Sequence, residues 1–98
     1  EATDSRLCGF IELNIRNYAE GSKSANVPFV EGWFVDSNFR DRGYGRILMD
    51  RAENWALDSG FSELASDAEI ENTGSIYALK ALGFEEVDRI VCFLKSLK

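Results

Sequence analysis

The 98-residue sequence contains no histidine, and it has one proline, one methionine and two cysteines. Without histidine, imidazole acid–base chemistry and the commonest protein ligand for metal ions are excluded, so we expect no metal site. No hydrophobic run is long enough to span a bilayer, and the first residues lack the pattern of a signal peptide. We therefore expect a cytoplasmic protein with no membrane partner.

The two cysteines, Cys8 and Cys92, each lie in an apolar run typical of a strand. We expect two buried free thiols, which fit a reducing compartment.

Charge is unevenly distributed along the chain, whose net charge of −6 argues against a nucleic-acid partner. Four of the basic residues fall in one short stretch: Arg40, Arg42, Arg46 and Arg51. Four acids form a later segment without Lys or Arg: Glu63, Asp67, Glu69 and Glu71. A basic pocket beside an acidic one suits an anionic cofactor and a cationic substrate, although for any single charge a solvated helix face or loop is the favoured explanation.

Two segments near the start have the pattern of strands. Residues 7–16 alternate the apolar Ile11, Leu13 and Ile15 with polar residues, which predicts a half-buried strand. A polar loop over residues 17–26 leads to a second strand over residues 27–35. The two strands are expected to form an antiparallel hairpin.

A helix and a returning strand follow, in the pattern of a βαβ unit. The helix is predicted by an apolar stripe at 3.6-residue spacing: Leu48, Ala52, Trp55, Ala56 and Ser59. Gly60 is expected to end it. Residues 61–68 then predict a strand parallel to the second one.

A second helix is expected between Asn72, as its cap, and Gly83, which ends it. The apolar run within residues 86–94 predicts a last strand. The sequence therefore predicts a single α/β domain over residues 1–98, with a mixed, mostly antiparallel sheet around a central βαβ unit. Two helices are too few to cover both faces of such a sheet.

The stretch "RDRGYGR" places glycines and arginines where the first helix begins. Unpaired amides at a helix start, with the positive end of its dipole, form an anion site. A dinucleotide fingerprint would need a third glycine where Leu48 stands, and no P-loop motif is present. What remains is the pattern R-x-x-G-x-G, supplied by Arg40, Gly43 and Gly45.

Together with the downstream "NTGSIYALKALGFEE", this pattern resembles the GNAT superfamily of acyl-CoA-dependent N-acyltransferases. The segments "FVEGWFV", "ELASDAEIEN" and "ALGFEE" are similar to those of the aminoglycoside 6′-N-acetyltransferases. The resemblance implies a GNAT-type sheet and acetyl-CoA as cofactor. It implies an enzyme that moves acetyl from acetyl-CoA to a primary amine by direct attack, with antibiotic resistance as a role.

The resemblance also implies which residues bind the cofactor. The pyrophosphate would rest on the amides of Gly43, Tyr44, Gly45 and Arg46, with charge from Arg40 and Arg42. Backbone groups of Phe34 and Val35 would bind the pantetheine arm, and the Val35 amide would stabilise the oxyanion. Asn72 and Ser75, on the second helix, would lie along the cofactor.

On the acceptor side, the resemblance makes Glu31 the first candidate base, directly or through a water. Asp67 is a second candidate, as base or as substrate anchor, and Trp33 would flank the acceptor pocket. At the position where many family members carry a tyrosine that protonates the leaving thiolate, this chain has Leu79. Tyr77 lies on another side of the helix and is not expected to replace it.

Family members also carry roughly fifty residues before this point, including a strand and two helices. Either the chain is a fragment, or dimerisation or strand exchange covers exposed sheet, so a homodimer is expected. Alternatives are acetylation of a polyamine or a protein N-terminus, or a truncated acyl-CoA-binding and self-association module with little activity.

Overall fold

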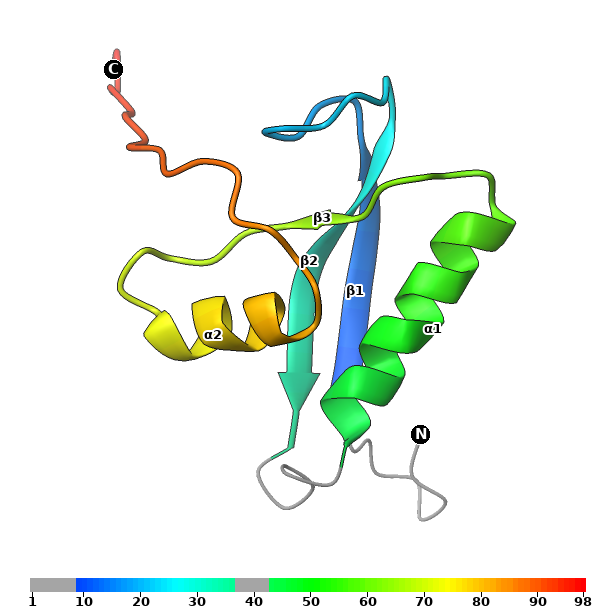
Figure 1. Ribbon diagram of the computed structural model, residues 1–98. Coiled ribbons are helices and arrows are strands. Elements are labelled where there is room, and N and C mark those ends of the chain that lie inside the picture. The colour runs from blue at the N-terminus through cyan, green and yellow to red at the C-terminus, as the bar shows by residue number, and fades with distance from the viewer. Residues whose placement is uncertain (1–8, 37–42) are drawn as a thin grey trace.

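The computed structural model describes residues 9–36 and 43–98. In chain order its elements are β1 (Gly9–Arg16), β2 (Val27–Val35), α1 (Tyr44–Asp58), β3 (Ala65–Ser66) and α2 (Thr73–Ala81) (Figure 1). The predicted positions Cys8, Arg40 and Arg42 lie outside the described residues. Among the residues that are described, no helix is long and apolar enough to cross a membrane.

The sheet has the strand order β1-β2-β3 and mixed pairing. β1 and β2 are antiparallel, and β2 and β3 are parallel, so the predicted hairpin and βαβ unit are both confirmed. The β1–β2 register shifts between Glu12, opposite Gly32, and Leu13, opposite Val30. Glu31 is therefore the extra residue of a β-bulge, a feature that re-aims side chains.

The third strand is much shorter than the sequence predicts. Residues 61–68 were expected to pair along their length, but only Ala65 and Ser66 do so, opposite Phe29 and Val30. Upstream of them, the Glu63 side chain bonds to the polar loop between β1 and β2 instead. The small core lies beneath this pairing, where Ala65 packs against a buried cluster: Ala19, Val27 and Phe29.

Helix α1 lies beside the hairpin and contacts both β1 and β2 (Figure 1). Its buried residues are Met49, Ala52 and Ala56, so the stripe facing the sheet is rotated from the predicted one. Trp55, expected on the buried stripe, is 43% exposed and packs beside Phe61.

The three helix ends that the sequence predicts at Gly60, Asn72 and Gly83 are all found. Gly60 has φ of 90° and its amide donates to the Leu57 carbonyl, which ends α1. The Asn72 side chain accepts a hydrogen bond from the Ser75 amide at 3.1 Å, which caps α2. Gly83, with φ of 97°, ends α2 in the left-handed conformation that favours glycine.

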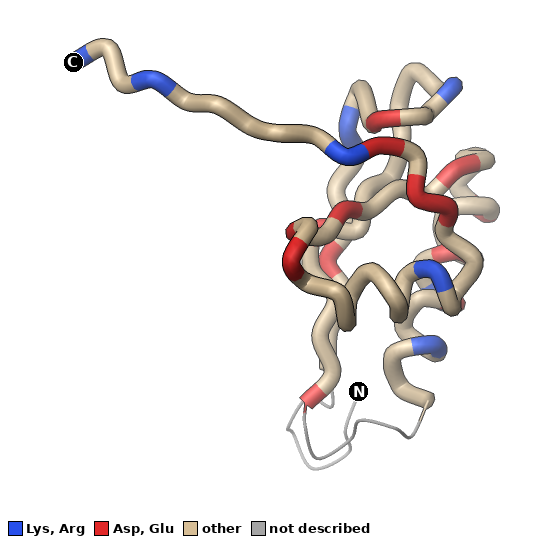
Figure 2. The backbone as a smooth tube through the Cα atoms, turned by 60° about the vertical axis from the view of Figure 1, so that its left-hand side comes forward, with Lys and Arg blue, Asp and Glu red and all other residues tan. Residues whose placement is uncertain are grey.

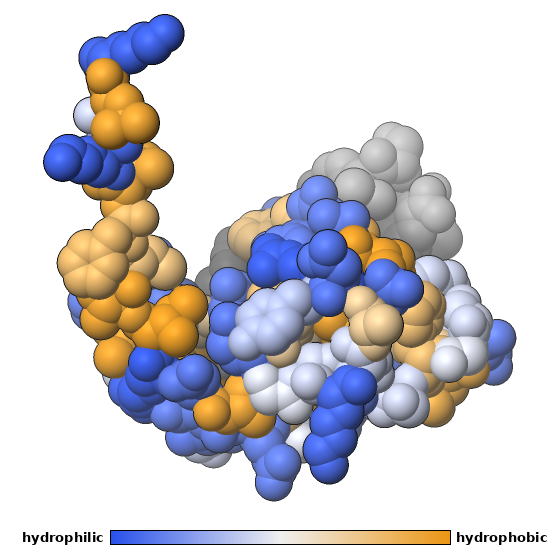
Figure 3. All heavy atoms as spheres, turned by 90° about the horizontal axis from the view of Figure 1, so that it is seen from above, coloured by the Kyte–Doolittle hydropathy of each residue, from blue (hydrophilic) through white to orange (hydrophobic). Residues whose placement is uncertain are grey.

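The predicted strand over residues 86–94 is wrong, because this segment pairs with no other strand among the described residues. It leaves the body of the molecule as an extended tail with hydrophobic side chains along it (Figures 1 and 3). Phe93 is 90% and Leu94 100% exposed. Cys92 is also exposed, so its predicted burial is wrong too. A strand needs a partner edge, and the two paired residues of β3 offer very little.

Candidate active site

The R-x-x-G-x-G motif, called the glycine loop below, reaches the start of α1 at Gly43, whose φ of 81° places it in the left-handed region. A Cβ there would have no neighbour within 4 Å, so the backbone conformation rather than crowding favours glycine. The first turn, with Tyr44, Gly45 and Arg46, contains no acid to offset the positive end of the helix dipole. The Arg46 side chain reaches across to the Ala81 carbonyl at the end of α2, at 3.4 Å.

Trp33 joins this helix start to the sheet. Its indole Nε1 donates to the Gly45 carbonyl at 3.2 Å. A Cβ on Gly45 would lie 3.2 Å from the Trp33 ring, so the second glycine of the motif permits this close approach. The residue that the sequence predicts as a wall of the acceptor pocket therefore also holds the predicted cofactor loop.

A small cavity of about 160 Å³ brings the three predicted acceptor residues together with two of the predicted cofactor residues. Glu31 and Trp33 come from β2, Asp67 follows β3, and Asn72 and Ser75 come from the start of α2. Phe34 and Val35 do not line this cavity; they end β2 opposite Phe10 and Gly9.

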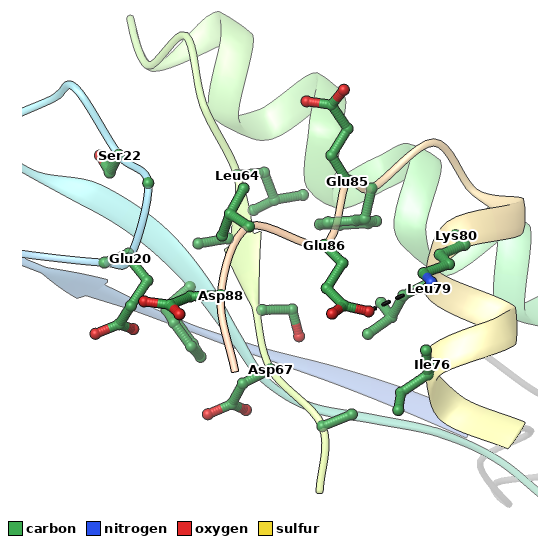
Figure 4. Close-up of a pocket in the computed structure, with 18 of the residues that line it drawn as sticks. Glu20, Ser22, Leu64, Asp67, Ile76, Leu79, Lys80, Glu85, Glu86 and Asp88 are labelled. Carbon is green, nitrogen blue, oxygen red and sulfur yellow. Dashed lines mark ion pairs between the residues drawn. The ribbon is translucent and has the colours of Figure 1, made fainter. Parts of the chain in front are cut away.

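Asp67 also lines a second, larger cavity of about 1150 Å³, so it stands where the two cavities meet. Acids line the larger cavity: Glu20, Glu53, Glu63, Asp67, Glu69, Glu85, Glu86 and Asp88. Figure 4 shows Glu20, Asp67 and Asp88 at one side of this space, and Figure 2 shows acidic residues before α2 and at the base of the tail. Three of the four acids of the predicted segment, Glu63, Asp67 and Glu69, thus line this cavity, together with the basic Lys80 and Arg89.

Two of these acids already have partners inside the protein. Glu63 accepts the hydroxyls of Ser22 and Ser24 at 2.8 and 2.7 Å, as well as the Lys23 amide, and these bonds lower the pKa of Glu63. Glu86 pairs with Arg89 and Lys80, which lower its pKa to about 2. Because Ser22, Lys23 and Ser24 all belong to the loop between β1 and β2, the bonds to Glu63 anchor this loop.

Arg16, which the sequence pattern does not single out, binds the first candidate base. Its Nε donates to Glu31 Oε2 at 2.8 Å and its terminal nitrogen to Oε1 at 2.6 Å. The guanidinium also lies over the Phe29 ring, 3.6 Å from the centroid. The Arg16 hydrogen bonds hold the pKa of Glu31 below its ordinary value of 4.5, with a smaller contribution from Asn14.

The residue at the predicted leaving-group position is not an acid. Leu79 lines both cavities and has no proton to donate. Tyr77 is 76% exposed and lines neither cavity, which agrees with its predicted position on another side of the helix.

Residues 2–84 match the acetyltransferase (GNAT) family. The chain belongs to this family. It is 46% identical over 96 residues to the aminoglycoside N(6′)-acetyltransferase type 1 of Klebsiella aerogenes, a match that covers 98% of the chain and 63% of that relative. The chain thus spans less than two thirds of the length of this relative.

Solved structures of the family are similar across nearly the whole chain. The aminoglycoside N-acetyltransferase AAC(6′)-Iy in complex with CoA has a TM-score of 0.90 and 38% identity, over 98% of this chain and 72% of that one. The same enzyme with the bisubstrate analog CoA-S-monomethyl-acetylneamine has a TM-score of 0.89 and 38% identity, over 97% and 65% of the two chains. The predicted α/β fold, with its mixed sheet of GNAT type, is confirmed by these likenesses.

Proposed function

We propose that the chain is an N-acetyltransferase that moves acetyl from acetyl-CoA to a primary amine, the 6′-amine of an aminoglycoside. One observation carries this proposal: Glu31 and Asp67 share a small cavity with Trp33, whose indole bonds to the glycine loop. Acids that suit an ammonium thus lie next to a helix start that suits a phosphate. The family membership and the names of the relatives support the same activity.

The residues at the start of α1 fit the pyrophosphate of CoA. The amides of Gly43, Tyr44, Gly45 and Arg46 belong to the turn that carries the positive end of the helix dipole. We propose that Arg40 and Arg42 add charge to this turn. Phe34 and Val35 would contribute backbone groups, and Asn72 and Ser75 would line the cofactor's path. When bound, acetyl-CoA supplies the acetyl thioester.

We propose that Glu31 and Asp67 bind the reacting amine. A carboxylate with a lowered pKa is a weak base, so Glu31 is better suited to anchor and orient an ammonium than to remove its proton. Asp67, which lines the same cavity, is the second candidate, as base or as substrate anchor. The acids of the larger cavity, continuous with the small one at Asp67, favour an acceptor that carries several ammonium groups.

We also propose a homodimer in the cytoplasm. The apolar tail, with Phe93 and Leu94 almost fully exposed, would be covered when it pairs with a second copy of the chain. The exposed Cys92 stays a free thiol only in a reducing compartment. Light scattering of the wild type and of Phe93→Glu tests the assembly, since the added charge should leave a monomer.

The activity is tested by the release of free CoA thiol from acetyl-CoA in the presence of aminoglycosides, polyamines and peptides. We expect turnover with aminoglycosides, and Glu31→Gln should raise the KM for the acceptor while leaving CoA affinity unchanged. Turnover only with polyamines or peptides would move the substrate class to one of those alternatives.

Binding of acetyl-CoA without turnover on any amine would instead support an acyl-CoA-binding and self-association module. Two observations favour that second function: Leu79 supplies no acid, and the tail is exposed.

A further inference from the structure

Arg16 places a positive charge in a region built mostly from acids. Its guanidinium bonds to both oxygens of Glu31, and the charges of Asp67 and Glu20 also act on it. These three carboxylates come from β2, from the segment after β3 and from the loop between β1 and β2. One cation of the chain therefore faces the acids proposed to bind a cationic acceptor.

The position of Arg16 is set by the strands. Arg16 ends β1 opposite Val27, and its side chain extends along β2 over Phe29 to reach Glu31. Phe29 is 3% exposed, so the ring beneath the guanidinium is fixed by the core. The Glu31 side chain is 24% exposed and that of Arg16 is 41% exposed. The ion pair is therefore held in place yet open to solvent on one side.

The two sides of the Glu31 carboxylate are used differently. Glu31 lines the small cavity, whereas Arg16 does not, so Arg16 approaches the carboxylate from outside this cavity. A carboxylate can accept about four hydrogen bonds, of which Arg16 uses two and Asn14 one more. An ammonium in the cavity would thus share Glu31 with Arg16 and meet an ion pair of zero net charge.

We propose that Arg16 is a built-in counterion of the acceptor site, a positioning residue that neutralises Glu31 and so limits how tightly a cationic acceptor binds. This inference rests on the proposed function of the same site. A weaker hold on the acceptor allows the acetylated product to leave. Without Arg16, the cavity would attract cations more strongly and Glu31 would protonate at higher pH.

The main test is the dissociation constant of neamine, measured by calorimetry for the wild type and for Arg16→Met. Methionine keeps apolar contact with Phe29 but removes the charge. We expect neamine to bind about two- to fivefold more tightly to Arg16→Met, the range expected for an exposed ion pair. Arg16→Lys, which keeps the charge without the bidentate geometry, should bind neamine as the wild type does.

The matched control is Arg51→Met, which makes the same change of net charge at an exposed position of α1. Unchanged or weaker neamine binding in Arg16→Met, or equal tightening in Arg51→Met, would overturn the proposal. So would Arg16→Lys that behaves like Arg16→Met, because charge would then not be the cause.

A second measurement separates this inference from the proposed activity. Carboxyl NMR titration of Glu31 needs no turnover, and its pKa should rise toward the ordinary value of 4.5 in Arg16→Met. The neighbouring groups that also act on the pair are Asn14, Asp67 and Glu20. If neamine binds but is not acetylated, the transferase proposal fails while the neamine affinities still decide the role of Arg16. If Glu31 titrates identically in both proteins, the counterion role is wrong whatever the activity.

Discussion

The Trp33 indole donates a hydrogen bond to the Gly45 carbonyl at 3.2 Å and so ties the sheet to the first turn of α1. Because Trp33 also lines the small cavity, a change there reaches both the acceptor site and the cofactor loop. This bond therefore links the proposed acceptor site to the proposed cofactor turn.

Trp33→Phe tests this connection. The variant keeps an aromatic ring against Gly45 but loses the donor, so the free energy of unfolding should fall by about 0.5–1.5 kcal/mol. CoA affinity should fall as well, because the first turn of α1 is less firmly placed. Urea unfolding and CoA calorimetry measure the two effects. Trp55→Phe, at the other end of α1, makes the same chemical change and should leave CoA affinity intact. Equal CoA affinities in Trp33→Phe and the wild type would separate Trp33 from the cofactor loop.

Gly43 and Gly60 form a matched pair at the two ends of α1. Their φ angles are 81° and 90°, and a Cβ at either would have no neighbour within 4 Å. Alanine at either position should therefore cost about 1–2 kcal/mol of stability through backbone strain alone. Only Gly43→Ala should also weaken CoA binding, because relief of the strain at its positive φ would shift the amides of the proposed pyrophosphate turn. CoA affinity that falls equally in both variants would point to lost stability rather than to a lost contact.

The helix ends and the strand hairpin could be predicted because their signals are local. Alternation over residues 7–16, the cap at Asn72 and the glycines Gly60 and Gly83 each act within a few residues. The glycine loop at Gly43 was recognisable for the same reason. These local signals were enough to predict the hairpin and the ends of the helices.

Other features depend on partners far away in the chain and were missed. The bulge at Glu31 and its contact with Arg16 appear only once the β1–β2 register is set. Two different sets of residues on α1 fit 3.6-residue spacing, and packing against the sheet determines that the set containing Met49 is the buried one. Residues 86–94 have the composition of a strand, but composition cannot supply the edge that a strand requires.

Asn72 is expected to contribute mainly through the cap of α2. Removing the side-chain oxygen in Asn72→Ala should lower the free energy of unfolding by about 0.5–2 kcal/mol, because the Ser75 amide loses its acceptor. Asn72→Asp keeps an oxygen in that place and should retain the stability. Thermal unfolding of the three proteins compares them. If Asn72→Asp were as unstable as Asn72→Ala, the cap would not explain the loss.

Glu63 makes stability depend on pH. Hydrogen bonds from Ser24 and Ser22 lower its pKa from 4.5, so the folded state favours the charged form. The stability that it contributes is therefore full above pH 4.5 and is lost as the pH falls through the lower pKa of the folded state. Glu63→Gln should be less stable than the wild type at pH 7, and the difference should shrink toward zero in strong acid.

Urea unfolding at pH 7 and at pH 3 measures this, with Asp50→Asn, an exposed acid on α1, as the control. The Glu63 hydrogen bonds also affect the proposed acceptor site, because the loop between β1 and β2 that they hold contains Glu20, which lines the larger cavity. Loss of the hydrogen bonds between Glu63 and this loop in Glu63→Gln should thus raise the KM for a polycationic acceptor while CoA affinity stays constant. A Glu63→Gln protein with wild-type KM and an unchanged pH profile would show that the serines hold the loop without the carboxylate.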